Sequence, residues 1–156
     1  MSKQENVIKL LLIEDSVEDA EQLISMLRNG GIAVRPARAT NEAELEDQVA
    51  RHTPDLILVN NAAKALQLPA VAEAVNRSGK DIAVVVTANA PTEDQIVEAF
   101  RGGARGVALR GRPEHLQVTV RREFDALTMR RSVRRLEAAL RETERRCDAL
   151  LDSSRD

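Results

Sequence analysis

The chain contains almost no aromatic residues and only one cysteine. Phe100 and Phe124 are its only aromatic side chains among 156 residues, and it has no tryptophan or tyrosine. A stacking platform for single-stranded nucleic acid or sugar needs several aromatic rings, so the composition disfavours one. The single cysteine, Cys147, excludes an internal disulfide framework and a multi-cysteine zinc site.

Long apolar runs and a strong net charge are lacking as well. No segment approaches the roughly 20 apolar residues that a membrane-spanning helix needs. The first six residues are polar and do not have the pattern of a signal peptide. We therefore expect a cytoplasmic location without membrane insertion. The formal net charge of −2 is too small to indicate a nucleic-acid-binding protein.

Five apolar runs of strand length alternate with segments of helical spacing. The runs cover residues 7–13, 32–37, 55–59, 82–86 and 106–109. Helices are expected between them, among others over 17–29, 63–77 and 93–101, with Thr40 and Thr92 as helix caps. Repeated strand–helix units predict an α/β fold with a doubly wound, five-stranded parallel sheet.

Polar side chains follow several of these strands at their carboxyl ends. Parallel strands joined by right-handed crossovers end along one edge of the sheet, so these side chains should lie together there. They form the candidate functional site: Glu14, Asp15, Asn60, Thr87 and Arg110. Asp55 instead begins its strand, about 16 Å from that edge, and we assign it no functional role.

The segment after Pro113 has no further proline and no glycine. Its small and apolar residues recur at alternating spacings of three and four, which is typical of a coiled-coil seam. The positions are Ala126, Met129, Val133, Leu136, Leu140, Thr143, Cys147 and Leu150. A helix over residues 114–151 would be about 57 Å long. The domain is too small to cover it, so we expect the distal part to pair, giving a homodimer.

Residues 7–112 resemble the receiver domain of two-component response regulators. The similar segments are Leu11–Ser16, Pro54–Asn60, Val85–Ala88 and Gly103–Ala104. The resemblance implies a flavodoxin-like or CheY-like fold with a magnesium site and a phosphoacceptor site. An acidic pair of the family holds Mg²⁺, and Glu14 and Asp15 match it. An aspartate, a Ser/Thr and a lysine form the phosphoacceptor site; here the matching residues are Asn60, Thr87 and Arg110.

The chain departs from the family at the residues that carry the chemistry. Phosphoryl transfer needs a carboxylate nucleophile, and the Asn60 amide is a very poor one. With one anionic ligand lost, Mg²⁺ should bind more weakly. Arg110 and Gly111 replace a Lys-Pro pair, and Val107 replaces the aromatic residue that reports activation. Together these changes predict a pseudo-receiver that takes no phosphate, has no enzymatic activity and needs no cofactor.

A narrower resemblance covers the whole chain. Residues 11–19, 78–82 and 140–154 are similar to the N-terminus of FimX-type proteins, in which a degenerate receiver precedes PAS, GGDEF and EAL domains. That family binds cyclic-di-GMP through its EAL domain and supports type IV pili and twitching motility. The resemblance implies partners in these downstream domains and in a further protein at the cell pole.

We therefore divide the chain into four parts. Residues 1–6 are a polar tail, 7–125 a receiver-like domain, 126–151 a helical coiled-coil linker, and 152–156 the start of a PAS-like domain. The linker seam is carried mainly by Met129, Val133, Leu136, Leu140, Cys147 and Leu150.

The resulting hypothesis is a non-phosphorylated pseudo-receiver for dimerisation, docking and localisation. Two alternatives stay open: a functional phosphoacceptor that uses another carboxylate, and an antiterminator-type regulator that binds nucleic acid through its arginine-rich helix. We interpret the arginines of that helix as a solvated face with interleaved glutamates. They are Arg121, Arg122, Arg130, Arg131, Arg134 and Arg135.

Overall fold

A parallel sheet of five strands organises the chain, which the computed structural model describes over residues 7–153. The strands are β1 (Ile8–Ile13), β2 (Val34–Arg38), β3 (Leu56–Asn60), β4 (Ala83–Ala88) and β5 (Gly106–Leu109). They pair in the order β2-β1-β3-β4-β5, and every pair is parallel. The predicted fold class is confirmed.

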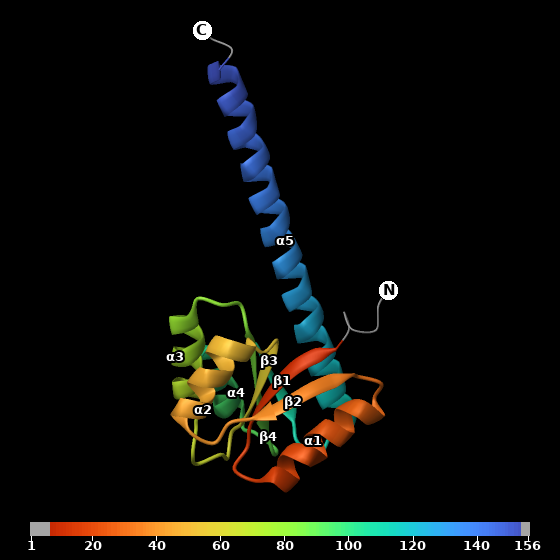
Figure 1. The fold of residues 1–156 in the computed structure, drawn as a ribbon. Helices are drawn as coiled ribbons and strands as arrows, with labels where there is room; N and C mark the ends of the chain where they lie inside the picture. The colour runs from red at the N-terminus through yellow and green to blue at the C-terminus, as the bar shows by residue number, and fades with distance from the viewer. Residues whose placement is uncertain (1–6, 154–156) are drawn as a thin grey trace.

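Helices cover both faces of the sheet (Figure 1). One core cluster joins the sheet to α1 (Val17–Asn29) and α5 (Pro113–Ser153). The opposite face is covered by α2 (Glu42–Asp47), its π-helical continuation η2 (Gln48–His52), α3 (Leu68–Ser78) and α4 (Glu93–Arg101). Alternate residues of β1 point to the two faces, because Leu10 and Leu12 join the first cluster whereas Leu11 and Ile13 join the second.

Two helix starts differ from the prediction. The alanine-rich helix expected from residue 63 begins only at Leu68, with Pro69 in its first turn, and residues 61–67 form a loop. The second helix is capped by Asn41 rather than by Thr40, because Asn41 accepts a hydrogen bond from the Glu44 amide at 2.8 Å. The cap predicted at Thr92 is confirmed.

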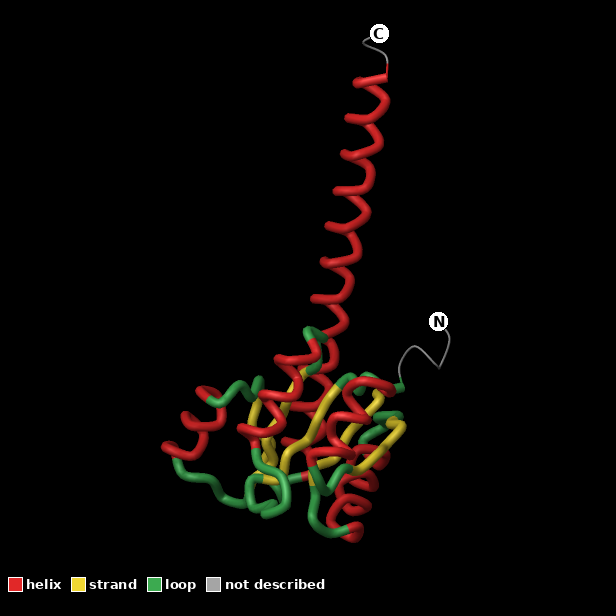
Figure 2. Tube along the Cα trace, turned by 60° about the vertical axis from the view of Figure 1, so that its left-hand side comes forward, coloured by secondary structure: helices red, strands yellow, loops and turns green. Residues whose placement is uncertain are grey.

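Helix α5 is far longer than the domain that it leaves (Figure 2). Its 41 residues correspond to about 60 Å of helix. Leu116, Val120 and Leu127 are buried against the sheet, so α5 packs on the domain past residue 125, the boundary that the sequence predicts. Residues 152 and 153, expected to begin another domain, are still helical. The tail of residues 1–6 and residues 154–156 lie outside the described part.

Within residues 7–153, no helix combines the length and the apolar composition that crossing a bilayer requires.

Candidate functional site

The carboxyl edge of the sheet brings four of the five predicted site residues into contact. Glu14 follows β1, Asn60 ends β3, and its neighbour in the sheet, Thr87, lies near the end of β4. Arg110 follows β5 and its side chain extends back over this edge. The apolar runs therefore place these polar residues together as predicted, because each run ends at the same edge.

Arg110 and Asn60 both bind the Glu14 carboxylate. Nη1 of Arg110 donates to Oε1 of Glu14 at 2.7 Å and to Oγ1 of Thr87 at 2.8 Å. Nδ2 of Asn60 donates to Oε2 of Glu14 at 2.8 Å. The Glu14 side chain is 1% exposed and that of Arg110 13%. A buried carboxylate is costly unless it is paired and hydrogen-bonded, and here both of its oxygens are satisfied by these two side chains.

Asp15 makes no hydrogen bond to these side chains that the structure shows, and it binds the loop between β3 and α3 instead. Its Oδ2 accepts from the Lys64 amide at 2.7 Å and its Oδ1 from the Ala65 amide at 3.3 Å. The side-chain oxygen of Asn60 likewise accepts from the Ala62 amide at 2.9 Å. The side chains of Asp15 and Asn60 therefore hold this loop through its backbone amides.

This arrangement does not fit the magnesium ion that the receiver fold implies. A hard divalent cation needs several oxygen ligands with negative charge. Here a guanidinium group already neutralises Glu14, and backbone amides occupy the Asp15 carboxylate. Among the described residues, no group of three or more His, Cys, Asp or Glu side chains is placed to hold a metal ion.

The turn after β5 also differs from a Lys-Pro turn. Gly111 has a φ of +79°, a conformation that proline cannot adopt because its ring fixes φ near −65°. The turn is held by Nδ1 of His115, which accepts from the Leu109 amide at 3.1 Å. The glycine thus allows the path that the backbone takes directly after Arg110.

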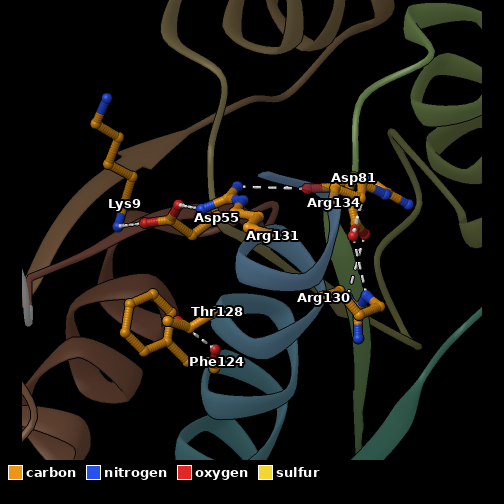
Figure 3. A network of polar contacts seen from close by, with 8 residues as sticks. All are labelled: Lys9, Asp55, Asp81, Phe124, Thr128, Arg130, Arg131 and Arg134. Atoms are coloured by element: carbon orange, nitrogen blue, oxygen red, sulfur yellow. Dashed lines mark hydrogen bonds and ion pairs between the residues drawn. The ribbon is translucent and has the colours of Figure 1, made fainter. Parts of the chain in front are cut away.

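A second polar network, at the amino edge of the sheet, was not predicted (Figure 3). Oδ2 of Asp55 accepts from the Lys9 amide at 2.8 Å, and its Oδ1 accepts from Nη1 of Arg131 at 2.7 Å. Arg131 also donates to the carbonyl oxygen of Asp81 at 3.4 Å. Asp55 therefore links β1 to helix α5 from its position before β3.

The Asp81 carboxylate binds two further arginines of α5. Arg130 forms a bidentate pair with it at 2.9 and 3.1 Å, and Nη1 of Arg134 lies 3.2 Å from its Oδ2. The hydrogen bond from Arg130 lowers the pKa of Asp81 below its usual value; desolvation opposes this effect, and the charges of Arg130, Arg134 and Arg105 add to it.

The solvated-face interpretation is therefore wrong for part of the arginine cluster. Arg130, Arg131 and Arg134 turn toward the domain, and the first two are about one-quarter to one-third exposed. A usable signal was their phase along the helix: Arg134 lies 18 residues, or about five turns, after the buried Leu116, on the same face.

The predicted seam residues lie on the outside of α5 and are not brought into contact with the domain. Met129, Val133, Leu136, Leu140 and Leu150 are between 45% and 71% exposed, and Cys147 is exposed as well. The described chain leaves these apolar side chains to solvent.

The comparisons with known proteins agree on the fold. No protein-family model matches the chain, and no curated protein sequence matches it. Among solved structures, the signal receiver domain described as that of a Luxo repressor protein from Vibrio parahaemolyticus superposes with a TM-score of 0.69 at 16% identity, covering 81% of this chain and 96% of that one. The chain has the receiver-domain fold.

Two other matches are a longer chain and a fusion protein. NtrX from Brucella abortus in complex with ATP gives a TM-score of 0.71 at 17% identity, over 83% of this chain but 29% of its own. A yeast Spc42 trimeric coiled-coil segment fused to another structure gives 0.69 at 20% identity, over 96% of both chains. This last match therefore includes most of α5.

Proposed function

We propose that this chain is a pseudo-receiver: a receiver-fold domain that works in two-component-type signalling without taking phosphate. The observation that carries the proposal is the contact of Arg110 with Glu14 and Thr87. In the matching site of a receiver, phosphorylation needs a carboxylate that accepts the phosphoryl group and free hydrogen-bond donors that bind its oxygens. Here the donors are already used within the protein.

The chemistry of Asn60 supports the same conclusion. Its side-chain nitrogen donates to Glu14 and its oxygen accepts from the loop, so both ends of the amide are engaged. An amide carries no negative charge and attacks phosphorus poorly. The edge is thus a set of internal contacts that holds β1, β3, β4 and the β5–α5 turn together.

The two alternatives have less support from these contacts. A phosphoacceptor that uses another carboxylate would have to free Glu14 from Arg110 or Asp15 from the loop amides. Asp55 lies at the amino edge and is bound by Arg131. Nucleic-acid binding through α5 would lose Arg130, Arg131 and Arg134, which already pair with aspartates of the domain.

The remaining roles concern docking. A domain without a phosphorylation switch can still bind partners through its surface, and the apolar seam of α5 is exposed to solvent in the described chain. We assign the chain to dimerisation, protein docking and localisation. On the basis of its resemblance to FimX-type proteins, we propose that it belongs to a cyclic-di-GMP signalling protein that supports type IV pili and twitching motility. A fluorescent fusion of this chain should gather at the pole of a piliated cell, and a diffuse signal would contradict the localisation role.

The direct test is phosphorylation of the purified chain. After incubation with acetyl phosphate and Mg²⁺, intact-mass analysis should show no added phosphoryl group, whereas a competent receiver treated in parallel should show one. A labile phosphoryl adduct on the wild-type chain would overturn the proposal.

A further inference from the structure

Helix α5 has two faces with different tasks. Leu116, Val120 and Leu127 are buried against the sheet, and Arg131 and Arg134 continue this inner face toward Asp55 and Asp81. In an α-helix each residue advances by about 100°. These five residues therefore lie on one narrow face of α5, and Arg134 is the last of them along the helix.

The seam lies on the opposite side of the helix. Leu136 follows Leu127 by nine residues, which is about two and a half turns, so the two point in opposite directions. Leu127 is 0% exposed and Leu136 70%. The domain, held on the inner face by the arginines, therefore does not obstruct the seam.

The seam has a definite end on the side of the domain. Continuing its spacing from Ala126 toward the domain reaches Arg122, an exposed arginine. Two copies of Arg122 facing each other would repel, because like charges in contact are unfavourable. The apolar stripe therefore runs from Ala126 to Leu150, about 36 Å of helix.

A second copy of this chain is the occupant that fits this stripe. Two stripes with the same three–four spacing interlock knobs into holes, and identical chains supply identical stripes. The flanking charges also set the direction. With two chains parallel and in register, Ser132 faces Glu137 of the other copy and Ala139 faces Glu144, so no like charges meet there. With the stripes fully overlapped but antiparallel, Glu137 faces Glu137 of the other copy, and Glu144 faces Arg130, whose guanidinium group already binds Asp81.

We propose that the outer face of α5 binds a second copy of this chain in a parallel, in-register dimer, with the two receiver-fold domains on the outer sides. The inference rests on the proposed function and specifies its dimerisation. Figure 1 shows the end of α5 far from the domain, so a parallel pair would bring the two carboxyl ends together. Whatever follows in a longer chain would then start side by side.

Cys147 provides a probe for this geometry. It occupies a core position of the seam, so in the parallel, in-register dimer it faces its own copy, whereas in the antiparallel overlap it faces Met129. The chain has no other cysteine that could form a disulfide. Mild oxidation should therefore convert the wild-type dimer into a disulfide-linked dimer, visible on a non-reducing gel.

Two variants control the experiment. Cys147→Ser/Arg145→Cys moves the thiol to the side away from the partner and should cross-link at least tenfold more slowly. Leu136→Glu/Leu140→Glu should shift the reduced protein toward monomer in analytical ultracentrifugation. These leucines are outside the domain core, so circular dichroism should still show a folded domain.

The outcomes separate this inference from the proposed function. A reduced dimer at about 100 µM that cross-links through Cys147 supports the parallel arrangement. A reduced dimer that cross-links no faster than the Arg145→Cys control overturns the arrangement and leaves dimerisation standing. A trimer or a monomer overturns the inference, while the phosphorylation test still decides whether the chain is a pseudo-receiver.

Discussion

Arg110 and Glu14 are 96 positions apart in the chain, yet Nη1 of Arg110 lies 2.7 Å from Oε1 of Glu14. The pair joins the first and last strands of the sequence across the carboxyl edge of the sheet. Because the Glu14 side chain is almost fully buried, removing its partner should be costly.

We expect Arg110→Met to lower the free energy of unfolding by about 3 kcal/mol, because it leaves an uncompensated buried carboxylate. Urea unfolding measures this change. The double variant Glu14→Gln/Arg110→Met should recover much of the loss, since the buried charge is then gone. Equal losses in the single and double variants would show that the ion pair is not the source of the effect.

Restoring the missing nucleophile alone should restore little phosphorylation. In Asn60→Asp a carboxylate returns to the phosphoacceptor position, but Arg110 still lies between Glu14 and Thr87. We expect intact-mass analysis with acetyl phosphate and Mg²⁺ to show at most a minor adduct. The double variant Asn60→Asp/Arg110→Lys should take more, because lysine is the residue that pairs with the phosphoryl group in competent receivers. Ready phosphorylation of the single variant would show that Arg110 is no obstacle.

The fold and the carboxyl-edge site followed from the sequence because their signals are local. Buried parallel strands are continuous apolar runs, such as residues 55–59, and the polar residue after each run must lie at the shared edge. Residues 63–67 of the loop before α3 were predicted to be helical because alanine favours helices wherever it occurs. Pro69 marked the true start, since proline is favoured in the first turn.

The amino-edge network escaped prediction because it joins residues distant in sequence. Asp55 and Asp81 precede buried strands, where a lone aspartate is typical of a turn, and arginine on a helix is typical of solvent. Only the phase of Arg130, Arg131 and Arg134 relative to Leu116 and Leu127 indicates that they point inward. That relationship needs the packing face of α5, which the structure supplies.

The Asp81 network predicts a pH dependence of stability. Arg130 holds the pKa of Asp81 below its usual value, so the unfolded chain takes up this proton more readily than the folded one. The stabilisation is thus present at neutral pH and is lost as the pH falls below about 4. Asp81→Asn should cost about 1–3 kcal/mol at pH 7, measured by urea unfolding.

In acid, the difference between wild type and Asp81→Asn should shrink. Asp148→Asn, at an exposed position near the end of α5, serves as the control and should leave stability unchanged at either pH. A wild-type advantage over Asp81→Asn that stays constant down to pH 2 would contradict the ion-pair explanation.

The buried Leu127 predicts where the folded domain ends. A chain truncated after Asp125 loses Leu127 and the three arginines that bind Asp55 and Asp81, whereas one truncated after Glu137 keeps them. Burial of one leucine contributes about 1.5–3 kcal/mol, and hydrogen bonds to charged groups add to this. We therefore expect urea unfolding to show the shorter chain less stable by about 3 kcal/mol or more.

Single substitutions in the longer truncation identify the cause. Leu127→Ala should cost about 2–5 kcal/mol because it opens a cavity in the core. Val133→Ala, on the exposed outer face, should stay within about 0.5 kcal/mol of the parent. The shorter chain lacks the whole seam and the longer one keeps only its first four positions, so the two are compared at a concentration at which analytical ultracentrifugation shows both to be monomeric. Equal stability of the two truncations would place the boundary at residue 125, as the sequence predicts. It would also show that the arginine contacts contribute little to the stability of the domain.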